Sequence, residues 1–204
     1  MPKKLFFELD KEKQDRIITA AISEFAEYGY ENSSTNRIVR NCAISKGSLF
    51  KYFDNKEDMY FFLIDTVMAD MAKDMSVEIN SLSTNLYERI IEYSAAEISW
   101  YCKNPINGRF IIGIAKEKGS DIGEKIINRY GKKSNDIYHD LLNDIDESCI
   151  KNSKERAGDI LKWVLEGFNS SFLETVSWDS DIDKLKDEYI SKLKVYINVL
   201  KNGL

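Results

Sequence analysis

Long apolar runs, paired cysteines and secretion signals are all missing from this chain of 204 residues. No stretch approaches eighteen consecutive apolar residues, so the sequence predicts no transmembrane helix. The N-terminus lacks a long apolar core with a small-residue cleavage site, so we expect no secretory signal. Three cysteines, Cys42, Cys102 and Cys149, lie far apart without a C-x-x-C pair, as is usual in a reducing cytoplasm. These absences together predict a cytoplasmic protein with unpaired thiols.

Histidine and catalytic signatures are equally scarce. His139 is the only histidine, and no cysteine or other histidine lies at a spacing typical of metal ligands. The sequence contains no G-x-S-x-G motif, no phosphate-binding loop and no dinucleotide-binding fingerprint. We therefore expect no metal, no cofactor and no catalytic residue. An enzyme remains possible only as an all-α protein with an unrecognised pocket.

Residues that break helices are also few, with two prolines and ten glycines. Val and Thr are sparse beside Ile, Leu, Lys, Glu and Ala, which favours helices over strands. The apolar spacing predicts an all-α fold of about nine helices. They are expected near residues 11–28, after Ser33 or Ser34 as N-cap, around 47–51, and over 56–79, 84–103, 105–116, 121–148, 154–177 and 182–201. Asp54 or Asn55 would cap the helix that begins at residue 56.

Positive charge is concentrated in one short segment of an acidic chain. Between Ser33 and Lys56, five basic residues face Asp54 alone, whereas 19 basic and 26 acidic residues follow from Glu57 onward. A basic island on an acidic protein is typical of one anionic partner combined with a separate second task. The charge pattern therefore makes nucleic acid a candidate partner.

The same segment, SSTNRIVRNCAISKGSLFKYF, predicts two short helices joined by a tight turn. Apolar side chains would lock the two helices at a fixed angle, and they are Ile38, Val39, Ile44 and Leu49. The second helix would then direct small, basic and aromatic residues outward. This helix-turn-helix pattern predicts contact with double-stranded DNA.

The outward residues have chemistry suited to phosphates and base edges. Lysines neutralise phosphates, hydroxyl groups bond to phosphates or bases, and glycine lets the backbone approach closely. We expect an inward position for Phe50 and Phe53 from their spacing, and an outward position for Tyr52. The predicted DNA contacts are Ser34, Thr35, Arg37, Ser45, Lys46, Gly47, Ser48, Phe50, Lys51, Tyr52 and Lys56.

These residues carry a family resemblance. The pair Gly29-Tyr30, followed by Ile38-x6-Ser45-Lys46-Gly47-Ser48-Leu49-Phe50-x-Tyr52-Phe53-x2-Lys56-Glu57, resembles the DNA-binding segment of the tetracycline-repressor (TetR) family. The resemblance spans about residues 16–64. The family usually has glycine in the turn before the recognition helix, where this chain has Ala43. Since alanine adopts a positive φ only at a cost, the turn is expected to differ slightly.

The resemblance implies a dimeric repressor with residues 1–55 as its DNA-binding domain and residues 56–204 for effector binding and dimerisation. It implies a palindromic operator, a small organic effector, and a homodimer formed by the last two helices. Apolar faces on those helices agree with a partner that covers them. The family's effector pocket would be lined here by Trp100, Tyr101, Arg109, Phe110, Trp163 and Phe168, although core packing is the alternative for each.

Two further expectations concern the switch. The helix over 56–79 would act as a lever between the recognition helix and the effector pocket. An apolar or cationic organic molecule would bind there. The acids Glu97 and Glu117 lie nearby in sequence and would favour a cation if buried, although surface positions are the alternative for both. The alternative to a repressor is a helical small-molecule-binding or protein-interaction module that does not bind DNA specifically.

Overall fold

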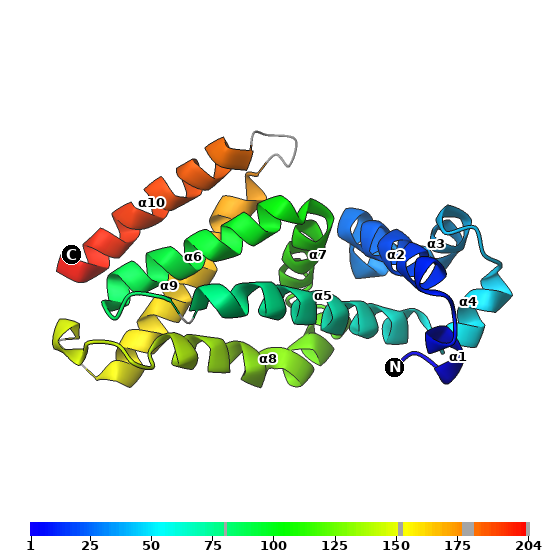
Figure 1. Ribbon diagram of the computed structural model, residues 1–204, viewed down its shortest axis with the longest axis horizontal. Helices are drawn as coiled ribbons and strands as arrows, with labels where there is room; N and C mark the ends of the chain where they lie inside the picture. The colour runs from blue at the N-terminus through cyan, green and yellow to red at the C-terminus, as the bar shows by residue number, and fades with distance from the viewer. Residues whose placement is uncertain (80, 151–152, 177–181, 203–204) are drawn as a thin grey trace. The chain divides into compact units, whose positions relative to one another are not determined.

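The computed structural model describes residues 1–79, 81–150, 153–176 and 182–202, and in these residues it contains helices and no strand (Figure 1). The predicted all-α fold is therefore confirmed. The helices are α1 (Lys4–Phe7), α2 (Lys11–Asn32), α3 (Thr35–Asn41), α4 (Lys46–Tyr52), α5 (Lys56–Ile79), α6 (Leu86–Lys103), α7 (Pro105–Lys116), α8 (Asp121–Leu141), α9 (Lys154–Glu174) and α10 (Ile182–Asn202), with a 3₁₀ turn at Glu147–Cys149. None of the described helices is long and apolar enough to cross a membrane.

Short polar side chains begin several of these helices as the sequence predicts. The Asp10 carboxylate accepts the backbone N–H of Lys13 at the start of α2, and the Asn55 side chain accepts that of Asp58 at the start of α5. Ser45 caps α4 in the same way. Pro105 occupies the first turn of α7, where its missing N–H costs nothing.

Three features differ from the predicted helices. The short helix α1 was not expected, because four residues are too few for a periodic apolar pattern. The helix expected over 121–148 is wrong at its end, because α8 stops at Leu141. Helix α2 also does not stop before Gly29 but continues to Asn32 through a kink, where Gly29 has φ 69° and ψ −179°. A residue with a side chain rarely adopts that conformation, so glycine permits the kink.

The chain divides into two compact units. Unit 1 consists of residues 1–73 and 104–123, and unit 2 of residues 74–103 and 124–204. Helix α5 passes from the first unit into the second, and α7 is an insertion of unit 1 between two segments of unit 2. The predicted boundary between a DNA-binding domain (1–55) and an effector-binding domain (56–204) was defined by function. The two units are defined by contacts, so this boundary stays a prediction.

Unit 1 is held together by an aromatic core between α2, α5 and α7. The rings of Phe25 and Tyr60 lie 4.8 Å apart, and those of Tyr60 and Phe110 lie 5.5 Å apart. All three side chains are buried. Aromatic pairs at these distances contribute beyond the area they bury, so this core fixes α7 firmly against α2.

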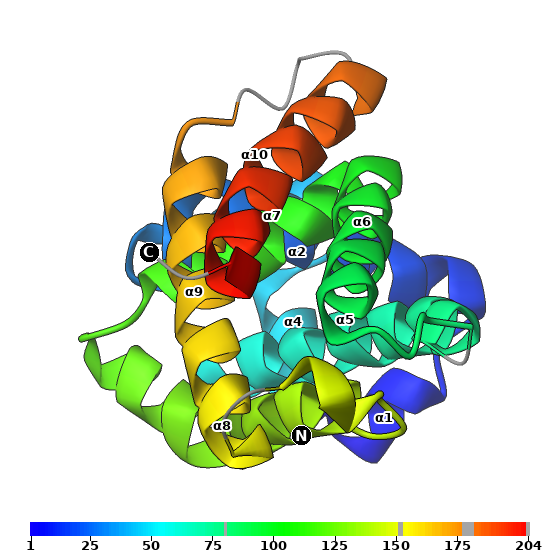
Figure 2. The same ribbon diagram turned by 90° about the vertical axis from the view of Figure 1, so that its left-hand side faces the viewer.

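Unit 2 has an apolar core of its own. Helix α6 packs against α10 (Figure 2). Rings of α9 and α10 also meet, with the centroids of Phe168 and Tyr189 5.1 Å apart. The Tyr189 hydroxyl group lies 2.5 Å from the side-chain oxygen of Asn169. Leu193 and Ile197 are buried on the same face of α10.

Candidate nucleic-acid interface

Helices α3 and α4 form the helix-turn-helix that the sequence predicts. Ile38, Val39 and Leu49 are buried between them. The turn is closed by a hydrogen bond of 3.0 Å from the backbone N–H of Ile44 to the carbonyl oxygen of Val39. Ala43 has φ 54°, in the left-handed region that favours glycine. The expected slight difference of the turn from that of the family stays a prediction. The turn fixes the direction in which α4 leaves it.

The outer surface of α4 carries small and basic residues. Ser45, Lys46, Gly47 and Lys51 are exposed. The Ser45 hydroxyl group accepts the backbone N–H of Ser48 at 3.0 Å and lies 2.8 Å from the Ser48 hydroxyl group. Among the described residues, no ion pair engages Lys46 or Lys51. Their ammonium groups are therefore available to phosphates.

The two aromatic positions of α4 are reversed relative to the sequence prediction. Tyr52 was expected outward but is 6 % exposed, and Phe50 was expected inward but is 37 % exposed. The reason is the unpredicted α1, since Phe6 lies against Tyr52 with ring centroids 6.2 Å apart. The backbone N–H of Lys3 also donates to the carbonyl oxygen of Tyr52 at 2.8 Å. The expected orientation of both rings is therefore wrong.

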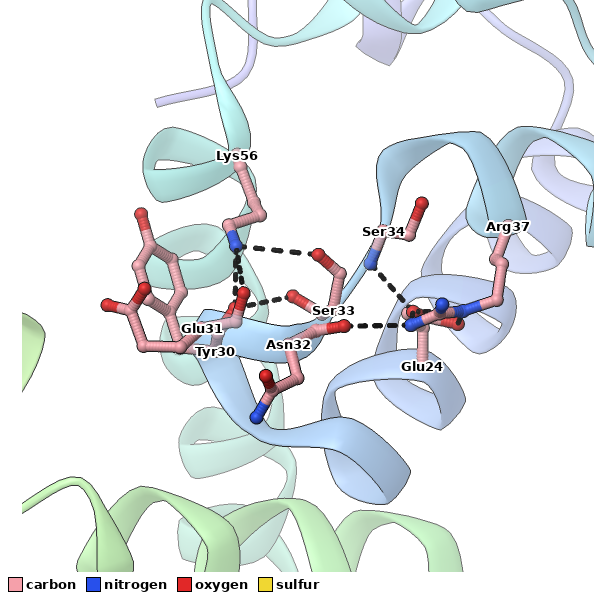
Figure 3. Close-up of polar contacts among 8 residues, drawn as sticks. All are labelled: Glu24, Tyr30, Glu31, Asn32, Ser33, Ser34, Arg37 and Lys56. Carbon is pink, nitrogen blue, oxygen red and sulfur yellow. Dashed lines mark hydrogen bonds and ion pairs between the residues drawn. The ribbon is translucent and has the colours of Figure 1, made fainter.

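Arg37, a predicted phosphate contact, is bound to a buried acid of its own chain (Figure 3). Its guanidinium group lies 2.6 Å from a carboxylate oxygen of Glu24, which is 3 % exposed. The same group donates to the carbonyl oxygen of Asn32 at 2.8 Å and lies over the Tyr28 ring at 4.1 Å. The Glu24 hydrogen bond raises the pKa of Arg37. The structure thus gives Arg37 a positioning role, and its contact with DNA stays a prediction.

Glu24 also holds the start of α3. Its carboxylate accepts the backbone N–H of Ser34 at 2.7 Å (Figure 3). Ser34 is the N-cap of α3 by position, but its side chain makes no capping bond. Ser34 and the following Thr35 are half-buried, and their contacts with DNA stay predictions. Glu24 was not predicted from the sequence. Its place on the same face of α2 as the apolar residues Ile17 and Ala21 indicates that this acid is buried.

Lys56 is likewise engaged within the protein. Its ammonium group donates to the carbonyl oxygens of Tyr30 at 2.6 Å, Glu31 at 3.2 Å and Ser33 at 3.4 Å (Figure 3). It also lies 4.4 Å from the centre of the Tyr30 ring. These carbonyl groups end α2 without partners in the helix, so Lys56 acts as a C-cap. A phosphate contact by Lys56 would compete with this arrangement.

Residues 17–61 match the family model described as "Bacterial regulatory proteins, tetR family". This segment contains the helix-turn-helix and the first turns of α5. The DNA-binding segment of this chain is therefore that of the tetR family.

A curated relative matches a longer part of the chain. The chain is 24 % identical over 194 residues to the biofilm operon icaADBC HTH-type negative transcriptional regulator IcaR of Staphylococcus aureus, with 90 % of this chain and 98 % of the relative covered. The match with this relative thus extends along nearly the whole length of both proteins.

Solved structures share the fold. A TetR family transcriptional regulator from Chloroflexus aurantiacus has a TM-score of 0.71 and 22 % identity, with 100 % of this chain and 98 % of that chain covered. The regulator FadR from Bacillus subtilis, in complex with stearoyl-CoA, has a TM-score of 0.66 and 19 % identity, with 88 % and 96 % covered. At these identities the likeness concerns the fold alone.

The predicted effector-binding residues of this chain are divided between the two units. Arg109 is exposed and Phe110 buried in unit 1. In unit 2, Trp100 and Tyr101 are buried, Phe168 is half-buried, and Trp163 is exposed. The indole N–H of Trp100 donates to the Asp74 carboxylate at 3.1 Å. Their assembly into one pocket stays a prediction.

In unit 2 the half-buried acid Glu97 accepts the Tyr101 hydroxyl group at 2.9 Å. Burial raises the pKa of Glu97, and the Tyr101 hydrogen bond partly opposes this. Burial and the Glu97 carboxylate in turn raise the pKa of Tyr101. The side chains of His139 and Cys149 lie outside the described residues, so the predictions for them are untested.

Proposed function

We propose that this regulator is a cytoplasmic, ligand-responsive repressor that binds a palindromic operator as a homodimer and is released by a small organic effector. The observation that carries the proposal is the exposed surface of α4, where Lys46 and Lys51 make no described ion pair while the opposite face is buried. A helix of this kind fits the major groove, with its lysines on the phosphate backbone. The printed name of IcaR, a negative transcriptional regulator, supports repression.

Dimerisation is part of the proposal because a palindrome requires two recognition helices. Two half-sites are read together only when the helices lie about 34–36 Å apart, one turn of DNA. Exposed apolar side chains on α9 and α10 support a dimer through these helices, and they are Ile160, Trp163, Val195, Tyr196 and Val199. An apolar surface of this kind commonly marks an interface.

Release by an effector requires a difference in affinity between DNA-competent and incompetent forms. FadR was solved with stearoyl-CoA, which supports a ligand with a long apolar part. In this proposal residues 56–204 bind the effector, residues 1–55 bind DNA, and the protein catalyses no reaction. Helix α5 would act as a lever, since Lys56 at its start holds the end of α2.

The test is a fluorescence anisotropy titration of the full chain with a duplex from the promoter upstream of its own gene. A scrambled duplex of equal length serves as the control. We expect tighter binding to the promoter, and weaker binding to both duplexes as salt rises. Equal affinity for both duplexes, or no binding to any neighbouring promoter, would support the interaction-module alternative instead.

A further inference from the structure

The backbone of Tyr30 is held at both of its polar atoms by side chains from two other helices. Its N–H group donates to the Glu117 carboxylate, which follows α7, at 2.8 Å. Its carbonyl oxygen accepts the Lys56 ammonium group of α5 at 2.6 Å and the Ser33 hydroxyl group at 2.7 Å (Figure 3). All these residues belong to unit 1. A single peptide segment thus joins α2, α5 and the end of α7.

The kink at Gly29 places Tyr30 in reach of Glu117. Gly29 adopts φ 69°, and a Cβ atom built on it would lie 3.2 Å from the nearer Glu117 carboxylate oxygen. Both the positive φ and the close approach therefore favour glycine at this position. The carboxylate is itself oriented, because the other oxygen of Glu117 lies 3.4 Å from the Ser120 hydroxyl group.

Glu117 lies in a segment that the aromatic core of unit 1 holds in place. Phe110 of α7 is buried against Phe25 and Tyr60, with centroid distances of 6.4 Å and 5.5 Å. The Glu117 carboxylate contributes to raising the pKa of Tyr60, after burial as the larger cause. A movement of α7 would therefore carry Glu117 with it and alter the bond to Tyr30.

The chain crosses between unit 1 and unit 2 within α5, ahead of α7, and after α7. The two unit 1 segments that lead into unit 2 are therefore the ones that supply Lys56 and Glu117. After Tyr30 the chain continues through Asn32 and Ser34, which are tied to Arg37 and Glu24, and then into α3. The Tyr30 segment thus has polar contacts with residues of both connections and leads directly into α3.

We propose that Glu117 is a positioning residue for DNA binding, which acts together with Lys56 by fixing the Tyr30 segment and, through it, the orientation of α3 and α4. The proposal rests on the proposed function, because it assigns to one site the coupling between the effector-binding part and the recognition helix. In this proposal the end of α7 couples the effector-binding part to the recognition helix in addition to the lever helix α5. Glu117 and Lys56 both bind the backbone of one residue, Tyr30, so the effects of replacing them on DNA affinity are not independent.

The test compares Glu117→Ala, Glu117→Gln and Lys56→Met in the full chain, with Glu124→Ala as the matched control. Glu124 is an exposed glutamate near the start of α8, and it is not among the described partners of Tyr30. Glu117→Ala removes the acceptor of the Tyr30 N–H, whereas glutamine still offers an amide oxygen. Lys56→Met keeps the alkyl chain over the Tyr30 ring and removes the ammonium group. Operator and scrambled duplexes are titrated by fluorescence anisotropy at one salt concentration.

We expect Glu117→Ala to weaken operator binding about tenfold while scrambled-duplex binding changes less than about threefold. Glutamine should restore most of the loss. The double variant Glu117→Ala with Lys56→Met should bind little worse than the weaker single variant, because both changes release one segment. If the fold-losses of operator affinity in the two single variants multiply in the double variant, the proposal is overturned. So would Glu117→Ala binding that equals the wild type.

A second readout does not depend on DNA. Amide hydrogen exchange at Tyr30 should be faster in Glu117→Ala than in the wild type, Glu117→Gln and Glu124→Ala. Only Glu117→Ala removes the acceptor of the Tyr30 N–H group. Unchanged exchange at Tyr30 would overturn the proposal even if DNA affinity fell. If the wild type itself fails to distinguish operator from scrambled duplex, the proposed function fails. The Tyr30 exchange then still decides whether Glu117 holds the segment.

Discussion

Lys51 and Lys56 carry the same charge in different surroundings. Lys51 is exposed on α4 and makes no ion pair among the described residues, whereas Lys56 donates to three carbonyl oxygens at the end of α2. A lysine that only neutralises a phosphate binds every DNA sequence equally. A lysine that orients the recognition helix affects the affinity for the operator more than the affinity for other DNA. The structure therefore separates two roles that the sequence assigned alike.

The first prediction concerns Lys51→Ala. Affinity for operator and scrambled duplex should fall by a similar factor, and the slope of log affinity against log salt should decrease by about one phosphate contact. Anisotropy titrations at several salt concentrations measure both quantities. Lys116→Ala, at an exposed lysine of α7, is the matched control and should bind like the wild type. A loss restricted to the operator would instead place Lys51 among the sequence-reading residues.

The second prediction concerns Glu97, the half-buried acid of unit 2. Burial raises the pKa of Glu97, so the native state binds this proton more tightly than the unfolded chain does. Its stabilising contribution is complete below the unfolded pKa of about 4.3 and is lost as pH rises through the raised native pKa. Glu97→Gln removes this dependence. The variant should therefore gain stability relative to the wild type as pH rises from about 4 to 8.

Urea denaturation of wild type and Glu97→Gln at several pH values measures that difference in unfolding free energy. The control is Glu124→Gln, because Glu124 is exposed. Glutamine keeps an oxygen that can accept the Tyr101 hydroxyl group, so the lost charge is the main change. A difference that stays constant across the pH range would contradict the assignment of Glu97 as a desolvated acid.

At the scale of single elements, the turn before α4 combines a common motif with an unusual residue. Ala43 has φ 54°, where an L-residue with a Cβ atom is strained by about 1–2 kcal/mol. Its side chain is exposed, so replacement removes no packing. Glycine relieves the strain but makes the unfolded chain more flexible, which costs about 0.4–1 kcal/mol.

The third prediction follows from these opposed effects. Ala43→Gly should raise the free energy of unfolding by about 0.5–1 kcal/mol, as measured by urea denaturation. Operator affinity should stay equal or improve slightly, because the native turn is unchanged. Ala69→Gly, at an exposed position within α5, is the control and should destabilise the protein as glycine does inside helices. If Ala43→Gly also destabilises, the strain at the turn is smaller than the cost in chain entropy.

The elements that the sequence predicted well are those with long periodic patterns or distinct caps. The start of α7 at Pro105, the cap at Ser45 and the inward positions of Ile38 and Leu49 follow from local rules. Helix α1 could not be predicted in this way, because Phe6 gains its place from rings distant in sequence. The same contact decides that Tyr52 faces inward.

The hydrogen-bond and ion-pair partners of the charged residues could not be predicted from the sequence either. Arg37 and Lys56 carry the charge that phosphates prefer, and composition alone favoured DNA as their partner. Their acceptors are Glu24, thirteen residues away from Arg37, and the carbonyl groups at the end of α2. Such pairs depend on how helices meet in space. A buried acid on an apolar helix face, such as Glu24, is a sequence signal for them.

At the scale of the whole molecule, unit 2 has more apolar surface than one chain covers. Trp163 of α9 is 66 % exposed and Val195 of α10 is 62 % exposed. Leu193, also apolar and on α10, is fully buried in the core of the single chain. An aspartate at Leu193 would therefore unfold the unit rather than test an interface. Exposed apolar residues are the suitable positions for such a test.

The last prediction is that Trp163→Asp and Val195→Asp each convert the dimer to a folded monomer. Because both side chains are exposed in the single chain, the charge stays hydrated in the monomer and is buried only on association. Light scattering after size exclusion measures the mass, and circular dichroism verifies the helix content. Lys194→Asp, at an exposed neighbour on α10, is the control and should remain dimeric. Operator affinity of the monomeric variants should fall strongly, since one recognition helix reads only half of a palindrome. Dimers in both aspartate variants would place the interface on another surface.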